Sequence, residues 1–394
     1  MKILFVVNNF NFGGPQKSLL NLLYELEETD IEIDLMILNQ QDELTKYLPS
    51  YVNVKPVDSK FSVLMLNKSN LIRSIFKNLN HPILVWKALT FVLKSKLNLH
   101  DNTKAKQQFW VKNKWKNNKI KKHYDYAIGV SGGHSVYFIE DYINADYKIG
   151  WIRTDYRVLK RNHKIDQKYF NKMTGMLAVS SMCANIFKDI FNIEPLVFYN
   201  SLPIKLYANL PDENFIINSK TLNIATICRL DNGKGLDLLI ETATILKKRG
   251  LQFNWYVVGD GKLKDWLDNA IKDKELENNV IPLGFRFNTG SIVQKMDILV
   301  HPSRFEGKSN TIDEALYYNI PVVATNFETV YEQITDGQTG FIVEMKPEFI
   351  ASKIEMLSQH RAKLIEIKNN LSGQSKDQVS KGQEFISTIN KVGN

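Results

Sequence analysis

The chain has 394 residues, of which 44% are hydrophobic and 24% are charged, and its formal net charge is +9. This length predicts two domains with a core each, and the composition excludes a disordered or fibrous protein. The two cysteines, Cys183 and Cys228, exclude a disulfide-stapled fold and predict a reduced, cytoplasmic protein without a cysteine-based metal site. The apolar run at residues 3–7 is too short for a signal peptide, and no stretch has the length that a membrane span needs.

The positive charge is concentrated in residues 60–125. This segment has fifteen lysines and arginines against two acids, so it carries +13 and the rest of the chain −4. Apolar residues, including Trp86, Trp110 and Trp115, recur between the lysines. Basic amphipathic helices with tryptophan are typical of elements that dock on an anionic membrane surface, and we favour that interpretation. A solvated lysine face on ordinary core helices would give the same pattern. Nucleic-acid binding is not expected, because nothing resembles a base-reading module.

The first half of the chain alternates strand patterns with helical ones. Residues 1–8 form an apolar run typical of a strand buried in a parallel sheet, and a helix with leucines on one face follows at residues 18–26. The turn between them contains Gly13 and Gly14, but it lacks the G-x-G-x-x-G spacing of a dinucleotide site. Further strands are predicted at residues 31–38, 124–130, 147–152, 176–180 and 196–200. This alternation predicts a Rossmann-like α/β domain.

A second series of the same kind begins at residues 222–228. Its further strands are predicted at residues 253–258, 280–284, 298–300 and 321–324. In the glycine turn after the first strand, Arg229 and Lys234 leave the strand end together. Two cations at one strand end suit a diphosphate, whose oxygens they bind and whose charge they neutralise. A surface arginine and a surface lysine would show the same spacing.

Residues 301–332 contain the most informative motif. The strand at residues 298–300 leads into a short loop, and a helix then begins at Ser309 or Asn310, with Asp313 at the position of a capping partner. In such strand–loop–helix units, ligands lie at the carboxyl ends of the strands, where helix N–H groups attract anions. The motif therefore predicts an anion site at the start of this helix.

Two carboxylates flank that helix start, Glu306 in the loop and Glu314 one turn into the helix. We expect both to face the same crevice, where N–H groups near Ser309, Asn310 and Thr311 could hold a diphosphate. Carboxylates accept hydroxyl hydrogen bonds, which suits a sugar or a ribose. The spacing by itself favours a solvated loop residue and a surface helix residue, because two glutamates eight positions apart are common.

The context of these carboxylates resembles the retaining glycosyltransferases of family 4, which have the GT-B architecture. That family has S-x-x-E-G, a second glutamate, G/N-x-P-V-V-A-T and a closing E-x-I-x-x-G-x-x-G. The matching residues are Ser303, Glu306, Gly307, Glu314, Asn319, Pro321, Val322, Val323, Ala324, Thr325, Glu332, Ile334, Gly337 and Gly340. The resemblance extends over nearly the whole chain. It implies two Rossmann-like α/β domains that face each other across a cleft.

The resemblance also implies the domain boundaries and the donor site. Residues 1–203 would form an acceptor-side domain and residues 204–379 a nucleotide-sugar domain, with a final helix at about residues 380–394 packing back on the first. Arg229 and Lys234 would anchor the diphosphate, and Glu306 would orient the sugar. The other expected donor contacts are Gly13, Gly14, Gly259, Phe285, Ser309, Asn310, Thr311 and Glu314.

On the acceptor side, the expected cleft residues are His134, Arg153, Asp155 and Asn200. The family has a histidine where Arg153 stands, and an arginine cannot act as a general base at neutral pH. Arg153 could instead be a cation near the donor phosphates or the acceptor. His134 could be the cleft histidine or a structural residue.

The resemblance implies a retaining, metal-independent transfer of a hexose or N-acetylhexosamine from a nucleoside diphosphate sugar, most simply a UDP-sugar. The acceptor would be a lipid-linked or cell-surface glycan, such as capsule or teichoic acid, at the inner face of the cell membrane. No cofactor is expected, because cations stabilise the leaving group and no His, Cys and carboxylate grouping has metal-ligand spacing. The alternatives are a sugar-nucleotide epimerase or phosphorylase and, because of Arg153, a non-catalytic subunit with a partner subunit.

Overall fold

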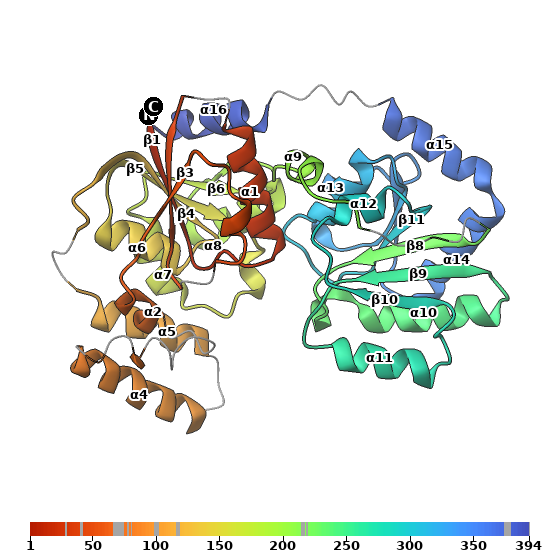
Figure 1. Ribbon diagram of the computed structural model, residues 1–394, viewed down its shortest axis with the longest axis horizontal. Helices are drawn as coiled ribbons and strands as arrows, with labels where there is room; N and C mark the ends of the chain where they lie inside the picture. The colour runs from red at the N-terminus through yellow and green to blue at the C-terminus, as the bar shows by residue number, and fades with distance from the viewer. Residues whose placement is uncertain are drawn as a thin grey trace. The chain divides into compact units, whose positions relative to one another are not determined.

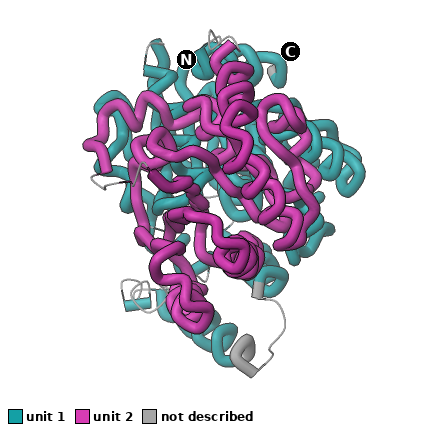
Figure 2. The backbone as a smooth tube through the Cα atoms, turned by 90° about the vertical axis from the view of Figure 1, so that its right-hand side faces the viewer, with its two compact units in different colours: residues 1–201, 379–394 teal, residues 202–378 magenta. Residues whose placement is uncertain are grey.

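The computed structural model describes residues 1–27, 30–39, 42–65, 75–76, 79, 81–97, 102–115, 119–213, 217, 220–373 and 380–393. Figure 2 shows its two compact units: unit 1 comprises residues 1–201 and 379–394, and unit 2 comprises residues 202–378. Each unit is built on one parallel sheet with helices. The predicted fold class, α/β with two Rossmann-like domains, is confirmed.

Unit 1 has a seven-stranded sheet with the order β3-β2-β1-β4-β5-β6-β7. Its strands are β1 (Lys2–Val7), β2 (Glu32–Ile37), β3 (Val52–Lys55), β4 (His123–Val130), β5 (Asn144–Ile152), β6 (Gly175–Ala178) and β7 (Leu196–Val197). Ile3 of the central β1 pairs with Ile33 on one side and Tyr126 on the other. Since both faces of a parallel sheet are covered, β1 is apolar along its buried length. The strand order reverses between β1 and β4, which is where open α/β sheets bind ligands.

The helices of unit 1 can be followed in Figure 1. They are α1 (Gly14–Glu25), α2 (Lys60–Leu64), α4 (Pro82–Leu97), α5 (Asn102–Asn113), α6 (His134–Tyr142), α7 (His163–Phe170), α8 (Ser181–Phe191) and α16 (Lys381–Gly393), with 3₁₀ turns η1 (Thr45–Tyr47) and η2 (Tyr156–Val158). The prediction that the first helix starts at residue 18 was wrong, because α1 begins at Gly14. Pro15 lies in its first turn, where the missing N–H costs nothing.

The basic segment, residues 60–125, contributes α2, α4 and α5 to unit 1, and its residues 66–74, 77–78, 80, 98–101 and 116–118 lie outside the described part. Trp110 is fully buried and donates from Nε1 to Asp141, and Trp115 packs edge-on against Phe61. These two tryptophans belong to the core and are not membrane anchors. Trp86 on α4 is different, since 66% of its surface is exposed.

Unit 2 has a six-stranded sheet with the order β10-β9-β8-β11-β12-β13. Its strands are β8 (Leu222–Ile227), β9 (Phe253–Val258), β10 (Val280–Gly284), β11 (Ile298–His301), β12 (Val322–Thr325) and β13 (Gly340–Val343). Its helices are α9 (Ile204–Ala208), α10 (Leu236–Lys248), α11 (Lys264–Asp273), α12 (Thr289–Val293), α13 (Asn310–Tyr317), α14 (Pro347–Gln359) and α15 (Arg361–Ser372), with 3₁₀ turns η3 (Asn232–Lys234) and η4 (Glu328–Glu332).

The sheet of unit 2 is covered on both faces, with α10 and α11 on one side and α12 and α13 on the other (Figure 1). Successive strand residues point to opposite faces of the sheet. Trp255 of β9 therefore packs in the core on the side of α10 and α11, and Tyr256 packs in the core on the side of α12 and α13. The strand order reverses between β8 and β11, which pair directly through Ile224 and Ile298. The carboxyl ends of these two strands therefore lie next to each other. Among the described helices of the chain, none has both the length and the apolar character to cross a membrane.

The C-terminal helix α16 packs against unit 1 through Phe385. This side chain is fully buried, and its ring centroid lies 5.8 Å from that of Phe5, 5.8 Å from that of Trp151 and 5.2 Å from that of Phe198. In the first turn of α16, Gly382 lies so close to Glu25 of α1 that a Cβ atom would approach the Glu25 carbonyl oxygen to 2.4 Å. These contacts connect the end of the chain to its beginning.

We expect Phe385→Ala to lower the free energy of unfolding of unit 1 by about 3–5 kcal/mol, because it leaves a cavity among three aromatic rings. Urea denaturation followed by tryptophan fluorescence measures this change. Phe349→Ala on α14 is the control, since Phe349 is half-exposed and its loss should cost less than about 1 kcal/mol. Equal effects of the two substitutions would show that α16 does not stabilise unit 1.

Candidate functional site

The loops that follow β8 and β11 touch each other through a glycine. Gly235 has φ +66°, and a Cβ atom there would lie 1.9 Å from the carbonyl oxygen of Pro302. Only glycine permits this contact. Gly259, after β9, has φ +147°, and its Cβ would lie 1.8 Å from the Cys228 carbonyl oxygen. Three strand ends are thus held in backbone contact, and Gly259 has a packing role there whether or not it also contacts a nucleoside.

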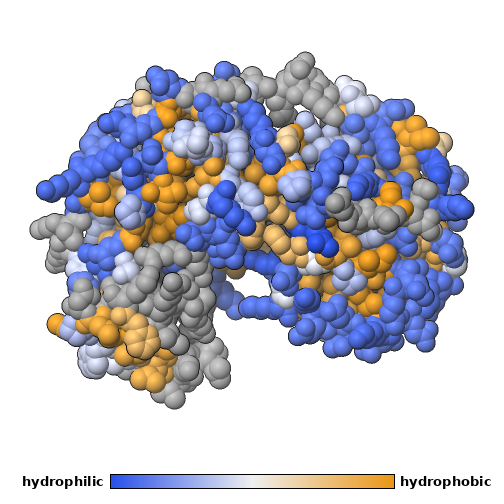
Figure 3. Space-filling model, in the orientation of Figure 1, coloured by the Kyte–Doolittle hydropathy of each residue, from blue (hydrophilic) through white to orange (hydrophobic). Residues whose placement is uncertain are grey.

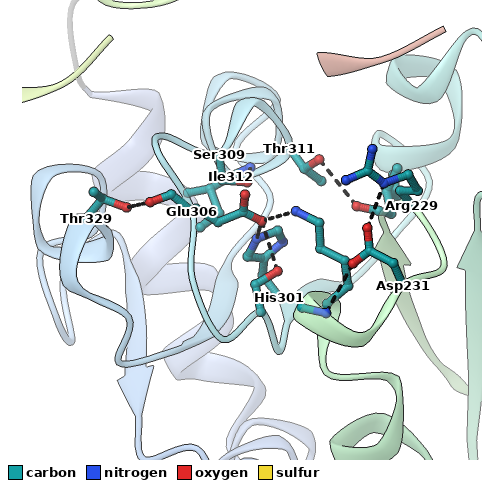
Figure 4. Close-up of polar contacts among 12 residues, drawn as sticks. Arg229, Asp231, His301, Glu306, Ser309, Thr311, Ile312 and Thr329 are labelled. Atoms are coloured by element: carbon teal, nitrogen blue, oxygen red, sulfur yellow. Dashed lines mark hydrogen bonds and ion pairs between the residues drawn. The ribbon is translucent and has the colours of Figure 1, made fainter. Parts of the chain in front are cut away.

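Glu306 is the centre of a polar cluster between these loops. Its Oε1 accepts from Lys234 Nζ at 2.6 Å and from Ser303 Oγ at 2.9 Å, and it lies 3.0 Å from His301 Nε2. The Thr329 hydroxyl donates to the Glu306 backbone carbonyl, which holds the loop from the other side (Figure 4). The structure therefore brings together Lys234 and Glu306, two residues that sequence analysis placed at separate strand ends.

Glu306 is ionised across the physiological pH range. Burial alone would raise its pKa, but the hydrogen bond from His301 and the charge of Lys234 outweigh burial and lower the pKa to about 2. A carboxylate with this pKa accepts hydrogen bonds and cannot supply a proton at neutral pH. Glu306 is therefore suited to orienting donor groups, including hydroxyls, and not to general acid catalysis.

His301 was not linked to Glu306 by sequence analysis. Its side chain is buried and contacts the ring of Phe327, and its Nδ1 has no partner among the described residues. His301 is the last residue of β11 and Glu306 lies in the loop that follows, so the sequence places the two residues near each other. This loop is irregular, so no periodicity predicts that the two side chains meet.

Ser309 caps the start of α13, as predicted, but its capping partner is Gln333 and not Asp313. Ser309 is the N-cap and accepts from the Ile312 N–H. Its own N–H donates to Gln333 Oε1, and Gln333 Nε2 donates back to the Ser309 carbonyl and to Asp313. The prediction that Asp313 is the capping partner was wrong, because Asp313 lies one position too far along the helix and pairs with Lys308 instead.

The first turn of α13 contacts the end of β8, because Thr311 Oγ1 donates to the Ile227 carbonyl (Figure 4). Asn310 is the first residue of the helix. The predicted anion site at Ser309, Asn310 and Thr311 therefore lies beside the two loops that carry Lys234 and Glu306. Contact of these residues with a diphosphate stays a prediction.

Arg229 lies apart from the Glu306 cluster. Its side chain is 75% exposed, and its Nε donates to Asp231 at 2.7 Å. Asp231 also accepts from the Gly233 N–H and so shapes the turn that precedes Lys234. Figure 4 shows the Arg229–Asp231 pair in the loop after β8. The two expected cations thus have different settings: Lys234 is partly buried and paired with Glu306, and Arg229 lies at the surface.

Glu314 is buried, with 3% of its surface exposed. Its Oε2 accepts from the Tyr207 hydroxyl at 2.8 Å and from Thr289 Oγ1 at 3.0 Å, so the carboxylate links α13 to α9 and α12. A role toward ribose hydroxyls stays a prediction and would involve a carboxylate that already has protein partners. Phe285, expected beside the base, is half-exposed at the end of β10.

The expected cleft residues of unit 1 form separate groups. Arg153 Nη2 donates to Asn200 Oδ1 at 2.6 Å, whereas Asp155 caps η2 and pairs with Arg157. His134 packs against Trp110, and burial together with the charge of Arg161 lowers its pKa to about 3. A histidine with such a low pKa is a poor base, which favours the structural alternative for His134.

The predicted glycine turn of unit 1 is accessible. Gly13, the N-cap of α1, and Gly14, its first residue, are exposed at the carboxyl end of β1, so their backbone is accessible there.

Within the described residues, one group of side chains could hold a metal ion, and it consists of His123, Asp125 and Asp146. These lie near the amino ends of β4 and β5, at the opposite edge of the sheet from the expected ligand site.

The low pKa of Glu306 predicts a pH-dependent contribution to stability. Its folded pKa lies below the ordinary value of 4.5, so the contribution is complete above pH 4.5 and is lost as the pH falls toward 2. We expect the difference in unfolding free energy between wild type and Glu306→Gln to shrink by about 2 kcal/mol between pH 6 and pH 3. Urea denaturation at stepped pH measures it. The control is Glu355→Gln, in a surface ion pair with Arg249. A difference that does not change with pH would contradict the Lys234–Glu306 ion pair.

Comparison with known proteins finds one family model and several relatives that each match part of the chain. Residues 212–374 match the family model described as "Glycosyl transferases group 1". A poly(ribitol-phosphate) alpha-N-acetylglucosaminyltransferase of Staphylococcus aureus is 26% identical over 193 residues, which are 48% of this chain and 38% of that protein. An N-acetylgalactosaminyltransferase of Campylobacter jejuni that acts on a diphospho-undecaprenol-linked sugar is 32% identical over 162 residues, 40% of this chain and 43% of that protein. The matches span about two fifths of these relatives.

Solved structures match the chain over its full length. Anabaena HepE in complex with UDP-glucose has a TM-score of 0.69 at 18% identity, covering 99% of this chain and 100% of that one. Staphylococcus aureus TarM has a TM-score of 0.68 at 16% identity, covering 100% and 99%. At these identities the likeness establishes the fold. Residues 212–374 are therefore similar to group 1 glycosyl transferases, and the whole chain has the fold of the HepE and TarM structures.

Proposed function

We propose that this protein is a retaining glycosyltransferase that moves a hexose or N-acetylhexosamine from a UDP-sugar to a lipid-linked or cell-surface glycan. The observation that carries the proposal is the Lys234–Glu306 pair at the adjoining ends of β8 and β11. It puts a cation and an ionised carboxylate side by side at the point where doubly wound sheets bind nucleotides. The match to group 1 glycosyl transferases covers this same part of the chain.

Lys234 and Arg229 would stabilise the leaving diphosphate. Negative charge grows on the phosphate oxygen as its bond to the anomeric carbon breaks, and cations already in place lower the energy of that state. Glu306 takes one of the three N–H donors of Lys234, so the ammonium can bind phosphate while it stays anchored. The exposed guanidinium of Arg229 is held at Nε and can turn its other N–H groups toward the ligand.

Glu306 would orient the sugar by accepting from its hydroxyl groups. The acceptor hydroxyl then attacks the anomeric carbon on the face from which UDP departs, and its proton passes to the leaving phosphate oxygen. The new glycosidic bond replaces the bond to phosphate, so the configuration is retained. No protein nucleophile takes part in this scheme, and the protein cations perform the neutralisation that a metal ion performs elsewhere. These features make a metal-independent reaction the simplest proposal.

The relatives support the donor and acceptor classes. HepE was solved with UDP-glucose, and the Campylobacter relative acts on an acceptor linked to a diphospho-undecaprenol. A sugar-nucleotide epimerase would instead turn over donor without any acceptor. A non-catalytic subunit would bind UDP weakly and would need a partner subunit for activity. Both alternatives are separated from a transferase by assays on the pure protein.

Lys234→Ala should lower sugar transfer by about 10²–10³-fold, because it removes the cation that would stabilise the leaving group. UDP should raise the melting temperature of the wild-type protein in the presence of EDTA, more than ADP or GDP does, and this rise should shrink in Lys234→Ala. Differential scanning fluorimetry and UDP release from candidate UDP-sugars measure the two effects.

Lys247→Ala is the matched control, since Lys247 pairs with Glu275 on the surface of α10. It should keep both the UDP response and turnover. Normal turnover by Lys234→Ala would contradict the assignment of this lysine. A wild-type protein that responds to no nucleotide would favour the non-catalytic subunit.

We further propose that the protein acts at the inner, cytoplasmic face of the cell membrane and docks there through α4. One face of this helix is buried in unit 1, at Leu84, Val85 and Ala88. The opposite face is also apolar and exposed, with Ile83 at 70%, Trp86 at 66%, Leu89 at 44% and Leu93 at 63%. Figure 3 shows this apolar surface over α4. The α4 sequence contains three lysines and no acid, which suits a surface of anionic lipid.

The double substitution Ile83→Ser and Trp86→Ser should weaken binding to vesicles that contain phosphatidylglycerol by at least about tenfold, because it removes apolar area from the contact. Vesicle sedimentation measures it, and added salt should weaken wild-type binding as well. Trp266→Ser on α11 is the control, since it removes a half-exposed tryptophan from unit 2. Unchanged binding by the double variant would exclude α4 as the docking surface.

A further inference from the structure

Unit 1 contains a pocket of about 370 Å³ that the proposed chemistry at Lys234 and Glu306 does not use. Its lining combines cationic and hydroxyl side chains with the backbone at the carboxyl ends of β4 and β5. The lining residues that matter here are Ser131, Gly133, Arg153, Thr154, Lys160 and Arg161. Among the described residues that line it, none is an aspartate or a glutamate. The pocket is therefore positively charged.

Arg153 is the feature that distinguishes this pocket. Its side chain is 7% exposed and lies over the Trp151 ring, with the guanidinium carbon 4.4 Å from the ring centroid. Nη2 donates to Asn200, whereas Nε and Nη1 are buried and have no partner in the described part of the chain. Burial lowers the pKa of Arg153 to about 9, so the side chain still carries its charge at neutral pH. A buried charge with two unused donors is unfavourable unless a ligand satisfies it.

The neighbouring residues Arg157 and Arg161 differ from Arg153 because each has a carboxylate partner. Arg161 donates to both oxygens of Asp166, at 2.7 Å and 2.8 Å, and Arg157 pairs with Asp155 at 2.7 Å. The fold thus supplies a carboxylate to Arg157 and Arg161 and, among the described residues, none to Arg153. This contrast within one short segment argues that the counter-charge of Arg153 comes from outside the chain.

The N-terminus of α6 adds donors at the edge of the same pocket. Gly133, which lines the pocket, is the N-cap of this nine-residue helix and offers no side-chain cap. Residues 131–133 all have positive φ, a backbone that turns sharply at the end of β4. The first N–H groups of a helix without a capping side chain attract anions. This element and Arg153 belong to different strand ends and point to the same class of ligand.

We infer that this pocket binds a compact oxyanion, a phosphate or carboxylate group, and that the anion is carried by the sugar acceptor. Arg153 offers it a positive charge and unused N–H donors, and α6 offers backbone donors. The binding of an anion here stands on the pocket alone. Its assignment to the acceptor rests on the proposed transferase function, with the donor diphosphate held in unit 2.

Thermal melting with inorganic phosphate, at constant ionic strength set with chloride, tests the anion site. Phosphate should stabilise the wild-type protein, and Arg153→Met should weaken its apparent affinity by about tenfold or more, since hydrogen bonds to a charged group are lost. Arg153→Lys keeps the charge, is expected to fold if Met does not, and should retain part of the response. Arg157→Met is the matched control, because Arg157 lies on the same segment and does not line the pocket.

Lys234→Ala separates the two possible phosphate sites. A response kept in Lys234→Ala and Arg157→Met but lost in Arg153→Met supports the inference. A response lost in Lys234→Ala and kept in Arg153→Met would mean that phosphate binds in unit 2 only, and it would overturn the inference. The absence of any phosphate response in the wild-type protein would overturn it as well.

The acceptor assignment is tested by steady-state kinetics with a phosphorylated glycan acceptor and its dephosphorylated counterpart. Arg153→Met should raise the KM for the phosphorylated acceptor at least about tenfold more than it raises the KM for the neutral one. Equal effects on both acceptors would reject the assignment. If no transfer is found at all, the proposed function fails, and the phosphate titration still decides whether the anion site exists.

Discussion

The carboxylate of Glu306 links the loops that follow β8 and β11 in unit 2. One of its oxygens contacts Lys234, Ser303 and His301, which come from the end of β11 and from the loops that follow β8 and β11. This contact is possible because the strand order reverses between β8 and β11 and because Gly235 lets the two loops touch. The pair is stable because the carboxylate stays ionised beside a cation. Lys234 is thereby held at the carboxyl edge of the sheet, where β8 and β11 end.

Lys234 in unit 2 and Arg153 in unit 1 differ in whether, among the described residues, a carboxylate neutralises the positive charge. In unit 2, Lys234 already has its counter-charge, and a ligand must share the ammonium with Glu306. In unit 1, Arg153 is buried with two unused donors, although the fold supplies partners to Arg157 and Arg161. An unpaired buried charge reduces the stability of a fold, and such departures from local consistency are typical of sites that bind something. The first arrangement suits a group that must be in place when a bond breaks, and the second suits recognition of a charged ligand.

Sequence patterns were reliable where a long run of residues carries the signal. Eleven of the thirteen described strands and the Ser309 cap were predicted, since a parallel sheet requires continuous apolar strands and a helix start requires a capping oxygen. The short strands β3 and β13 were missed. Predictions were wrong where the outcome depends on a single helix position or on the surroundings of a single side chain. Asp313 is one residue beyond the capping position, and the distant Gln333 takes its place. Trp110 was grouped with exposed basic residues, but it is a core residue that donates to Asp141.

The sequence by itself therefore determined the α/β class, the strand ends and the polar residues that follow them, because these depend on local periodicity and composition. Only the tertiary structure decided which of those residues meet. Lys234 and Glu306 are far apart in the chain, and their contact depends on strand order. Likewise, Arg153 looked like a simple exchange for a histidine until its burial and its unused donors were visible. Burial and pairing depend on neighbours supplied by distant segments, and no local pattern specifies them.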